Sequence, residues 1–321
     1  MYKPFFVNKK MAVSLSTLAG LKLSIDREYF HQQIVDSFLS DKRCASVDLG
    51  SMQRKSVLMQ NTDSGILLSN DPEAINSIDA GNEVVFYHPV KGVIFAYQKW
   101  GIDWDEYCWV RLFSTMQFVA NLKYAESNPN VVAHFLHINS GGGEGWMLDV
   151  ATAAMRSCKK PIYAFVERIC ASAAYRLAAQ AMVIKTFTDS DLIGSIGTYV
   201  KYLDVSEWMK MNGLKDVEVY ASQSDLKNKM DRDLEAGHPE QFVREILDPA
   251  NEQFIADVRC RKKLASLPDD SPVLRGEIFR ASEAVKSGLI DGVLPDLSAA
   301  IQEAHDLGVQ VRDNNQLLTN I

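Results

Sequence analysis

A serine and a lysine, Ser172 and Lys227, follow a glycine-rich loop in a stretch of chain that has no histidine between Ile138 and Gly237. A serine nucleophile needs a base that accepts its proton, and histidine is the usual base. Because this stretch contains no imidazole, lysine is the remaining candidate. If the chain is a serine hydrolase, the residue types therefore point to a Ser–Lys dyad.

The glycine-rich loop is Asn139-Ser140-Gly141-Gly142-Gly143, and we expect it to end a strand and enter a helix. Glycines let the backbone turn tightly and direct its N–H groups at an anion, either a phosphate or the oxyanion of an acyl-transfer intermediate. A phosphate loop would continue with Gly-Lys-Ser/Thr, whereas Glu144 follows here and opposes a phosphate. The pattern favours an oxyanion hole at Gly142 or Gly143, with a purely structural turn as the alternative.

Ser172 lies at a second expected strand-to-helix transition, followed by the small residues Ala173 and Ala174. A nucleophile at the start of a helix lies beside free backbone N–H groups, which stabilise developing negative charge. The N–H of Ala173 would then be a second oxyanion donor. The alternative is that Ser172 caps the helix, the common role of a serine at this position.

Short apolar strands alternate with helical patterns from about residue 83 onward, which is typical of the α/β class. The expected strands are 84–88, 131–138, 161–166, 182–187 and 217–220. The expected helices are 110–125, 143–156, 172–181, 205–211 and 249–263, the last with Asp248 as its N-cap. Residues 1–82 are expected to form an N-terminal extension with a helix at 27–39 and a polar linker at 61–82, and residues 296–321 a C-terminal helix and tail.

Composition and charge exclude several classes of protein. Of the 321 residues, 47% are hydrophobic and 23% charged, and the formal net charge is −7, which disfavours nucleic acid or an anionic membrane surface as the partner. No run reaches the roughly 18–20 apolar residues that span a bilayer, and residues 11–23 lack a signal-peptide cleavage site. The five cysteines show no metal-binding spacing, so we expect reduced thiols and a cytoplasmic protein.

Residues 83–295 resemble the signal peptide peptidase A (protease IV) family, which includes bacteriophage head-maturation proteases. Four motifs in the same order carry the resemblance. The glycine-rich loop is similar to the family's Asn-Ser-Pro-Gly-Gly, and Ala171-Ser172-Ala173-Ala174-Tyr175 is similar to its Ala-Ser-Gly-Gly-Tyr nucleophile motif. Gly194-Ser195-Ile196-Gly197 matches its Gly-Ser-Ile-Gly segment, and residues 276–291 resemble its closing Gly-x-x-Phe, Ala and Gly-Leu-Ile-Asp.

The resemblance implies roles for individual residues. Ser172 would be the nucleophile, Lys227 the general base, and Ser195 the group that orients the lysine amine. The oxyanion donors would be the N–H groups of Gly142, Gly143 and Ala173, and neither a metal nor an organic cofactor is needed. The implied fold is Clp protease/crotonase-like, built from repeated ββα units and usually assembled as a homo-oligomeric ring that cleaves extended polypeptides.

The sequence departs from the family pattern in three segments. Gly141 replaces the loop proline, which should loosen the turn, and the extra methyl groups of Ala173 and Ala174 should narrow the pocket. The segment around Lys227 lacks the family's common glycine, so Lys229 competes with it as the base. Clp-type proteases use a histidine base, but His134 and His137 lie three apart on an expected buried strand, where we expect hydrogen-bonded core or interface histidines.

The predicted function is therefore a Ser–Lys endopeptidase, specifically a phage or prophage capsid-maturation protease acting on scaffold or capsid proteins in the host cytoplasm or the procapsid. A cytosolic peptidase that degrades signal peptides is the second interpretation. A catalytically inactive ring that serves as an assembly scaffold is the third, and a crotonase-type acyl-CoA enzyme would leave the serine and lysine motifs without a purpose.

Overall fold

In a computed structural model of the chain, residues 58–60, 66–70, 75–76, 83–103, 108–215 and 217–319 are described. Residues 198–251 belong to one compact unit, and the other described residues form the second, larger unit. The helix expected at 27–39 lies outside the described residues. The expected linker at 61–82 is described in part, and it contains a strand that the polar composition did not predict, Leu67–Ser69.

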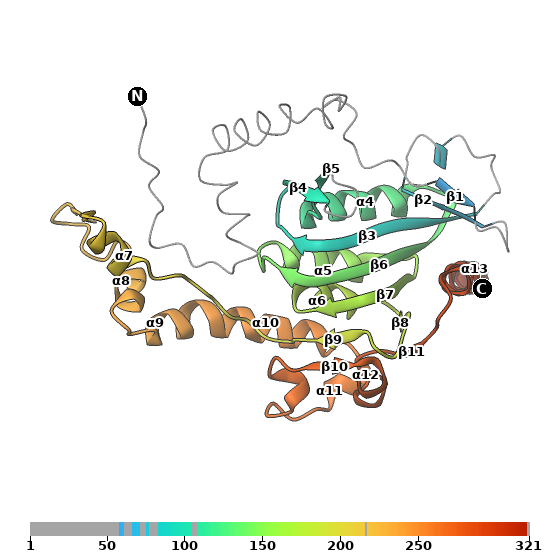
Figure 1. Cartoon of the computed structure of the whole chain (residues 1–321). Coiled ribbons are helices and arrows are strands. Elements are labelled where there is room, and N and C mark those ends of the chain that lie inside the picture. The colour runs from blue at the N-terminus through green and yellow to red at the C-terminus, as the bar shows by residue number, and fades with distance from the viewer. Residues whose placement is uncertain are drawn as a thin grey trace. The chain divides into compact units, whose positions relative to one another are not determined.

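The larger unit is built on one sheet in which parallel strands dominate, so the predicted α/β class is confirmed (Figure 1). The sheet has the order β1-β2-β3-β6-β7-β8-β11, and β9 pairs with both β7 and β10. Only the β1–β2 and β9–β10 pairs are antiparallel among its described strands. Its strands are β1 Leu58–Gln60, β2 Leu67–Ser69, β3 Val84–Ile94, β6 Val131–Gly143, β7 Ile162–Ala171, β8 Val183–Thr186, β9 Leu192–Gly194, β10 Ile278–Arg280 and β11 Gly292–Val293. A separate hairpin pairs β4 Trp100–Asp103 with β5 Cys108–Arg111.

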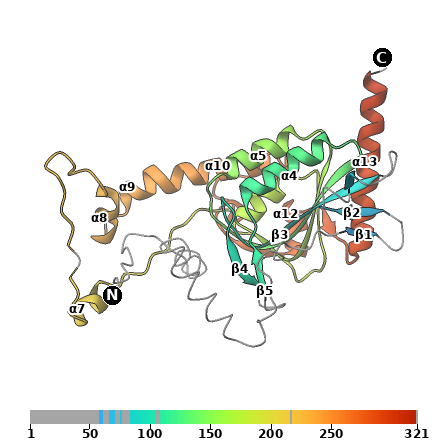
Figure 2. The same ribbon diagram turned by 90° about the horizontal axis from the view of Figure 1, so that it is seen from above.

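Helices cover both faces of this sheet, with α4 and α5 on one face and α13 on the other (Figure 2). Because side chains alternate along a strand, Leu136 and Ile138 join the core cluster under α4 to α6, whereas Phe135 joins the cluster under α13. The helices of the larger unit are α4 Thr115–Ser127, α5 Leu148–Ser157, α6 Ala173–Ala178, α11 Lys262–Ala265, the 3₁₀ turn η2 Pro272–Leu274, α12 Ala281–Ser287 and α13 Leu297–Thr319. α10 Asp248–Val258 begins in the smaller unit and ends in the larger one.

Four helices begin or end elsewhere than the sequence pattern predicted. The helix expected at 249–263 is interrupted, because α10 ends at Val258 and α11 begins at Lys262. Residues 110–111 belong to β5, and α4 starts only at Thr115, where the Ser114 hydroxyl accepts the N–H of Gln117 as a cap. β6 continues through Gly143, so α5 starts at Leu148. α6 ends at Ala178, short of the expected residue 181.

The smaller unit contains α7 Ser206–Met211, α8 Lys229–Glu235, α9 Glu240–Phe242 and the π-helical turn η1 Val243–Leu247. The strand expected at 217–220 is wrong: the described part of this segment is irregular and forms no ladder, and a strand needs a partner to be stable. Asp248 is not an N-cap, because η1 leads directly into α10. The π turn precedes Pro249, which has no N–H to continue the α-helical hydrogen-bond pattern.

Two further observations bear on function. Among the helices that the structure describes, none has both the length and the apolar character needed to cross a bilayer. The described cysteine side chains, those of Cys158, Cys170 and Cys260, are free thiols, as predicted.

Candidate active site

Three parallel strands, β6, β7 and β9, end at the same edge of the sheet and bring Gly142, Ser172 and Ser195 to that edge. The register pairs Ser140 with Cys170 and Ala171 with Gly194. Adjacent strands lie about 4.8 Å apart, so Ser172 and Ser195, each one residue beyond the paired Ala171 and Gly194, leave the sheet side by side. The sequence motifs that were separate along the chain therefore meet at one place.

Ser172 forms a strained turn between β7 and α6. Its backbone has φ 53° and ψ −126°, a sparsely populated combination for a residue with a side chain. The turn is fixed on both sides, because the Ser172 N–H donates to the Gly194 carbonyl at 2.9 Å and the Arg176 N–H donates to the Ser172 carbonyl at 3.0 Å. A sharp strand-to-helix turn of this kind is one way in which serine hydrolases expose the nucleophilic oxygen.

The geometry excludes the alternative in which Ser172 acts as a helix cap. Ser172 occupies the cap position, but its side chain makes no capping hydrogen bond, and its φ is positive instead of lying in the extended region that caps adopt. Within the described residues of the larger unit, the Ser172 hydroxyl has no hydrogen-bond partner. The hydroxyl is therefore not used to hold the helix.

Gly142 lies directly against the Ser172 turn. A Cβ atom at Gly142 would lie 2.8 Å from the Ser172 Cβ and 3.0 Å from the Ala173 nitrogen, and its φ of 102° also disfavours a side chain. At Gly143, a Cβ would lie 2.1 Å from the Ile94 carbonyl oxygen, because β6 and β3 pair closely there. Glycine is thus required at both positions by close approach of backbone, and the Gly142 backbone borders the Ser172 turn.

Ser140 and Glu144 hold the glycine-rich loop, in roles that the sequence analysis did not assign to them. The buried Ser140 hydroxyl donates to the Gly92 carbonyl at 2.6 Å and accepts the Gly142 N–H at 3.1 Å. The Glu144 carboxylate accepts the Ala96 N–H at 2.9 Å and pairs with Lys99 at 3.0 Å. In this conformation the Gly142 N–H is engaged within the loop, which leaves Gly143 and Ala173 as the oxyanion candidates without this competing bond. A polar residue on each side of a glycine run is the signal that could have identified both.

The side chains of Ala173 and Ala174 do not narrow an open pocket, contrary to the sequence-based expectation. Both are buried in the core cluster that α6 forms with the sheet. Their methyl groups therefore contribute to packing. The Ala173 N–H belongs to the first helical residue, where backbone donors have no acceptor within the helix.

Ser195 occupies a position that matches Ser172 on the neighbouring strand. Its φ is also 53°, and its N–H donates to the Glu277 carbonyl at 2.7 Å. The preceding Gly194 has φ 123°, and a Cβ there would lie 2.7 Å from the same carbonyl oxygen. The β9–β10 pair thus sets the position of Ser195 beside the Ser172 turn.

Lys227 and Lys229 lie in the smaller unit, and both are exposed there. Lys229 forms an ion pair with Asp233 one helical turn later, whereas the Lys227 ammonium has no partner among the described residues of its unit. The Arg232 guanidinium donates to the Lys227 carbonyl and, at 2.6 Å, to the Asp225 carbonyl, so it fixes the turn that carries Lys227. Between these two lysines, Lys227 is the one left free for chemistry within the unit. Its pairing with Ser172 stays a prediction.

His134 and His137 are buried and hydrogen-bonded, as predicted. His134 lies 3.0 Å from both His88 and Glu126, and His137 lies 3.0 Å from both Tyr87 and Glu167. Burial lowers the pKa of His134, and burial together with His134 holds the pKa of His88 well below its usual range. These histidines are therefore neutral members of core networks.

Donor atoms of Glu126, His134 and Cys158 lie within 4.8 Å of one another, a separation that could suit a metal ion. The Glu126 carboxylate, however, already faces His134 and accepts the N–H groups of Lys159 and Lys160 at 2.9 and 3.1 Å. Burial and the nearby Glu126 charge raise the pKa of the Cys158 thiol to about 12, so it is not a ready thiolate ligand. The contacts of this group are those of a structural network.

Known proteins resemble this chain at two levels. No curated protein matches the sequence. Among solved structures, the 1510-N membrane-bound stomatin-specific protease in complex with a substrate peptide is 15% identical, with 68% of this chain and 78% of that chain covered and a TM-score of 0.38. An enoyl-CoA hydratase/isomerase-like protein from Acinetobacter baumannii is 14% identical, with coverages of 83% and 88% and a TM-score of 0.39.

The family comparison is more specific than these structural likenesses. Residues 154–312 match the model described as peptidase family S49, and this range contains Ser172, Ser195 and Lys227 but begins after the glycine-rich loop. The matched range is just under half of the chain, so the chain is similar to peptidase family S49 over residues 154–312.

Proposed function

We propose that this protein is a Ser–Lys endopeptidase that cleaves extended polypeptides, with Ser172 as nucleophile and Lys227 as general base. The observation that carries the proposal is the Ser172 turn. Its positive φ is held by the Gly194 carbonyl, and Gly142 borders its Cβ, yet the hydroxyl is not spent on capping. Strain of this kind costs about 1–3 kcal/mol and persists where the surrounding structure enforces it, which is common at active sites.

In the proposed reaction, the unprotonated Lys227 amine accepts the Ser172 proton as the serine oxygen attacks the peptide carbonyl carbon. The carbonyl oxygen becomes an oxyanion, which accepts hydrogen bonds from the N–H groups of Gly143 and Ala173, joined by Gly142 if its bond to Ser140 opens. The lysine then returns the proton to the leaving amine, and an acyl-serine remains. Water, activated by the same amine, hydrolyses the ester and restores Ser172. Ser195 would orient the amine.

The exposed apolar side chains of the smaller unit support the further proposal that other polypeptide covers it. None of the described residues at 198–251 is buried. The exposed large apolar side chains of this unit include Tyr199, Leu203, Trp208, Met211, Leu214, Val217, Val219 and Leu226. Removal of such area from water is favourable at roughly 25 cal/mol per Å². We propose that neighbouring copies in a homo-oligomeric ring cover these side chains. Burial in that ring would also remove the Lys227 ammonium from water, which favours the neutral amine.

Intact-mass measurement of the purified protein tests the dyad, with and without an unfolded polypeptide substrate. We expect wild type to cleave itself or the substrate, and Ser172→Ala and Lys227→Ala to be inactive. Lys229→Ala is the matched control, because Lys229 is already paired with Asp233, and it should retain activity. Loss of activity only in Ser172→Ala and Lys229→Ala would reassign the base, and an inactive wild type in its assembled state would leave the scaffold interpretation.

The finer biological role proposed is capsid maturation in a phage or prophage, supported by the resemblance of the four motifs to a family that includes head-maturation proteases. Cleavage of a scaffold or capsid protein encoded beside this gene, lost in Ser172→Ala, would support it. Cleavage of released signal peptides instead would favour the peptide-clearing role.

A further inference from the structure

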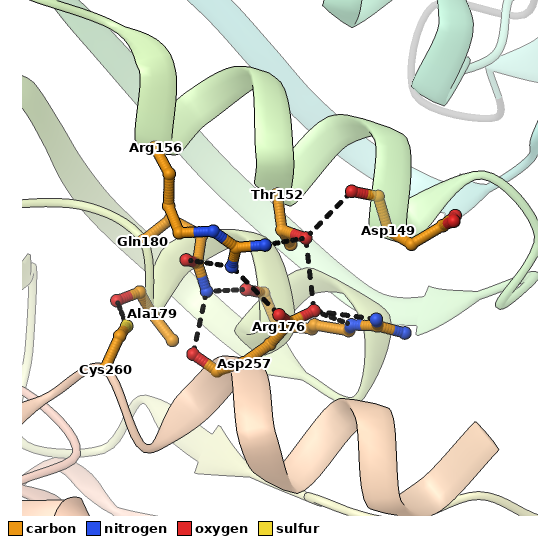
Figure 3. A network of polar contacts seen from close by, with 8 residues as sticks. All are labelled: Asp149, Thr152, Arg156, Arg176, Ala179, Gln180, Asp257 and Cys260. Atoms are coloured by element: carbon orange, nitrogen blue, oxygen red, sulfur yellow. Dashed lines mark hydrogen bonds and ion pairs between the residues drawn. The ribbon is translucent and has the colours of Figure 1, made fainter. Parts of the chain in front are cut away.

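A polar network joins α6, the helix that follows Ser172, to α10 (Figure 3). Its central contact is between Arg176 of α6 and Asp257 of α10, which are 81 residues apart in the sequence. At its centre the Asp257 carboxylate of α10 accepts two N–H groups of Arg176, each at 2.7 Å, through one oxygen. The Arg176 side chain is 6% exposed and that of Asp257 is 12% exposed, so both charges are largely removed from water. A buried charge of this kind requires its partner.

The same network also holds the C-terminal end of α6. The Gln180 amide, just past the end of α6, donates to the Arg176 carbonyl at 3.2 Å and to the Asp257 carbonyl at 3.0 Å. Ala179 follows the last residue of α6, and its carbonyl accepts the Cys260 thiol at 3.2 Å. α6 has only six residues, and so short a helix has little stability of its own. Its position therefore depends on contacts from outside.

Arg176 connects this network directly to the strained turn. Its backbone N–H donates to the Ser172 carbonyl at 3.0 Å, and its side chain is held by Asp257. The guanidinium also lies over the Phe254 ring, 5.9 Å from its centroid, which adds a second contact with α10. A displacement of Arg176 would thus move the Ser172 carbonyl group, to which its N–H is bonded.

We propose that Asp257 is a positioning residue for the Ser172 nucleophile, acting through Arg176. The inference rests on the proposed peptidase function. In this role, Asp257 touches neither the substrate nor the reacting atoms. It holds Arg176 of α6, so that the Ser172 backbone keeps its positive φ. Misplacement of a reacting group by about 1 Å can reduce a rate by about 100-fold.

The test compares Asp257→Asn with Asp291→Asn, measured below the melting temperature of each. Asp291 is a matched control, since it accepts Arg261 at 2.8 Å and the Ile184 N–H at 2.7 Å without contact to α6. For Ser172-dependent cleavage of a fluorescein-labelled unfolded polypeptide, we expect Asp257→Asn to lower kcat by about tenfold to 100-fold, with KM and the shape of the pH profile unchanged. Asp291→Asn should lower thermal stability with kcat retained.

A second readout does not depend on catalysis. Hydrogen exchange at the Arg176 amide reports its bond to Ser172, and we expect this exchange to accelerate by about tenfold or more in Asp257→Asn but not in Asp291→Asn. If Asp257→Asn does not fold, the double variant Arg176→Met/Asp257→Leu removes both charges and is the one measured, with the same expectations.

The two readouts separate the possible failures. Unchanged exchange at Arg176 in the Asp257 variant overturns the positioning role, whether or not the protein cleaves. Equal loss of kcat in both single variants also overturns it, because stability alone then explains the loss. A wild type that never cleaves refutes the proposed function, and accelerated exchange would then support only the contact between Asp257 and the Ser172 turn.

Discussion

Substitution of Gly142 by alanine tests whether the glycine-rich loop borders the Ser172 turn as the structure shows. The new Cβ would lie 2.8 Å from the Ser172 Cβ and 2.9 Å from the Ala171 carbonyl oxygen, and the φ of 102° is strained for alanine. The strain alone costs about 1–3 kcal/mol. Relief requires the end of β6 or the Ser172 turn to move by several tenths of an ångström, so we expect activity to fall by about tenfold to 100-fold.

Gly141→Ala is the matched control, one residue earlier in the same loop. A Cβ at Gly141 meets no atom within 4 Å, and its φ is not in the strained positive range. The assay is the initial rate of Ser172-dependent cleavage, together with the melting temperature. We expect Gly141→Ala to match wild type in both measurements, within about 0.5 kcal/mol in stability. Full activity in Gly142→Ala, or equal damage in both variants, would refute the close approach as the reason for glycine.

Further predictions concern stability. Burial raises the pKa of Glu126, but hydrogen bonds from His134 and two backbone N–H groups outweigh it and lower the pKa to about 2. The stabilisation is thus present above the unfolded pKa near 4.5 and is lost as pH falls toward 2, by about 2 kcal/mol after allowance for partial exposure. The lowered pKa values of His88 and His134 also make the folded state less stable as pH falls below about 6.5. The melting temperature of Glu126→Gln should depend less on pH between 5 and 3 than that of wild type. Gly308→Ala should destabilise the protein by about 1–3 kcal/mol despite alanine's better helix propensity, because its Cβ would lie 2.6 Å from the Val132 carbonyl oxygen; a raised melting temperature would show that α13 can move away from β6.

The sequence predicted the central strands β6 and β7 well, because both begin with a mainly apolar run. It failed where local pattern and tertiary context disagree. The apolar residues of the 217–220 segment fit a strand, but no described strand of that unit pairs with them. β6 continues through three glycines because Ile94 and its neighbours in β3 accept that backbone as a partner, and no local propensity shows this.

The candidate site was predictable as a set of residue types but not as a geometry. Motif order placed Ser172, Ser195 and the glycine-rich loop in one site, and the β6, β7 and β9 register brings them together. The supporting residues could not be found in this way. Asp257 lies 81 residues from Arg176, a contact for which the sequence has no spacing rule. Ser140 and Glu144 are marked only by flanking the glycine run, and their partners Gly92 and Ala96 are distant in the sequence.

The two serines at the strand ends argue for chemistry more strongly than the motifs do. Ser172 and Ser195 share a φ of 53°, a conformation in which glycine would be the unstrained choice. Within the described residues of their unit, neither hydroxyl forms a hydrogen bond that would offset this strain by stabilising the fold. Backbone strain of this kind is concentrated at functional sites. It supports the proposal that the Ser172 oxygen acts on a ligand at the edge of the sheet where Gly143 and Ala173 carry backbone N–H groups.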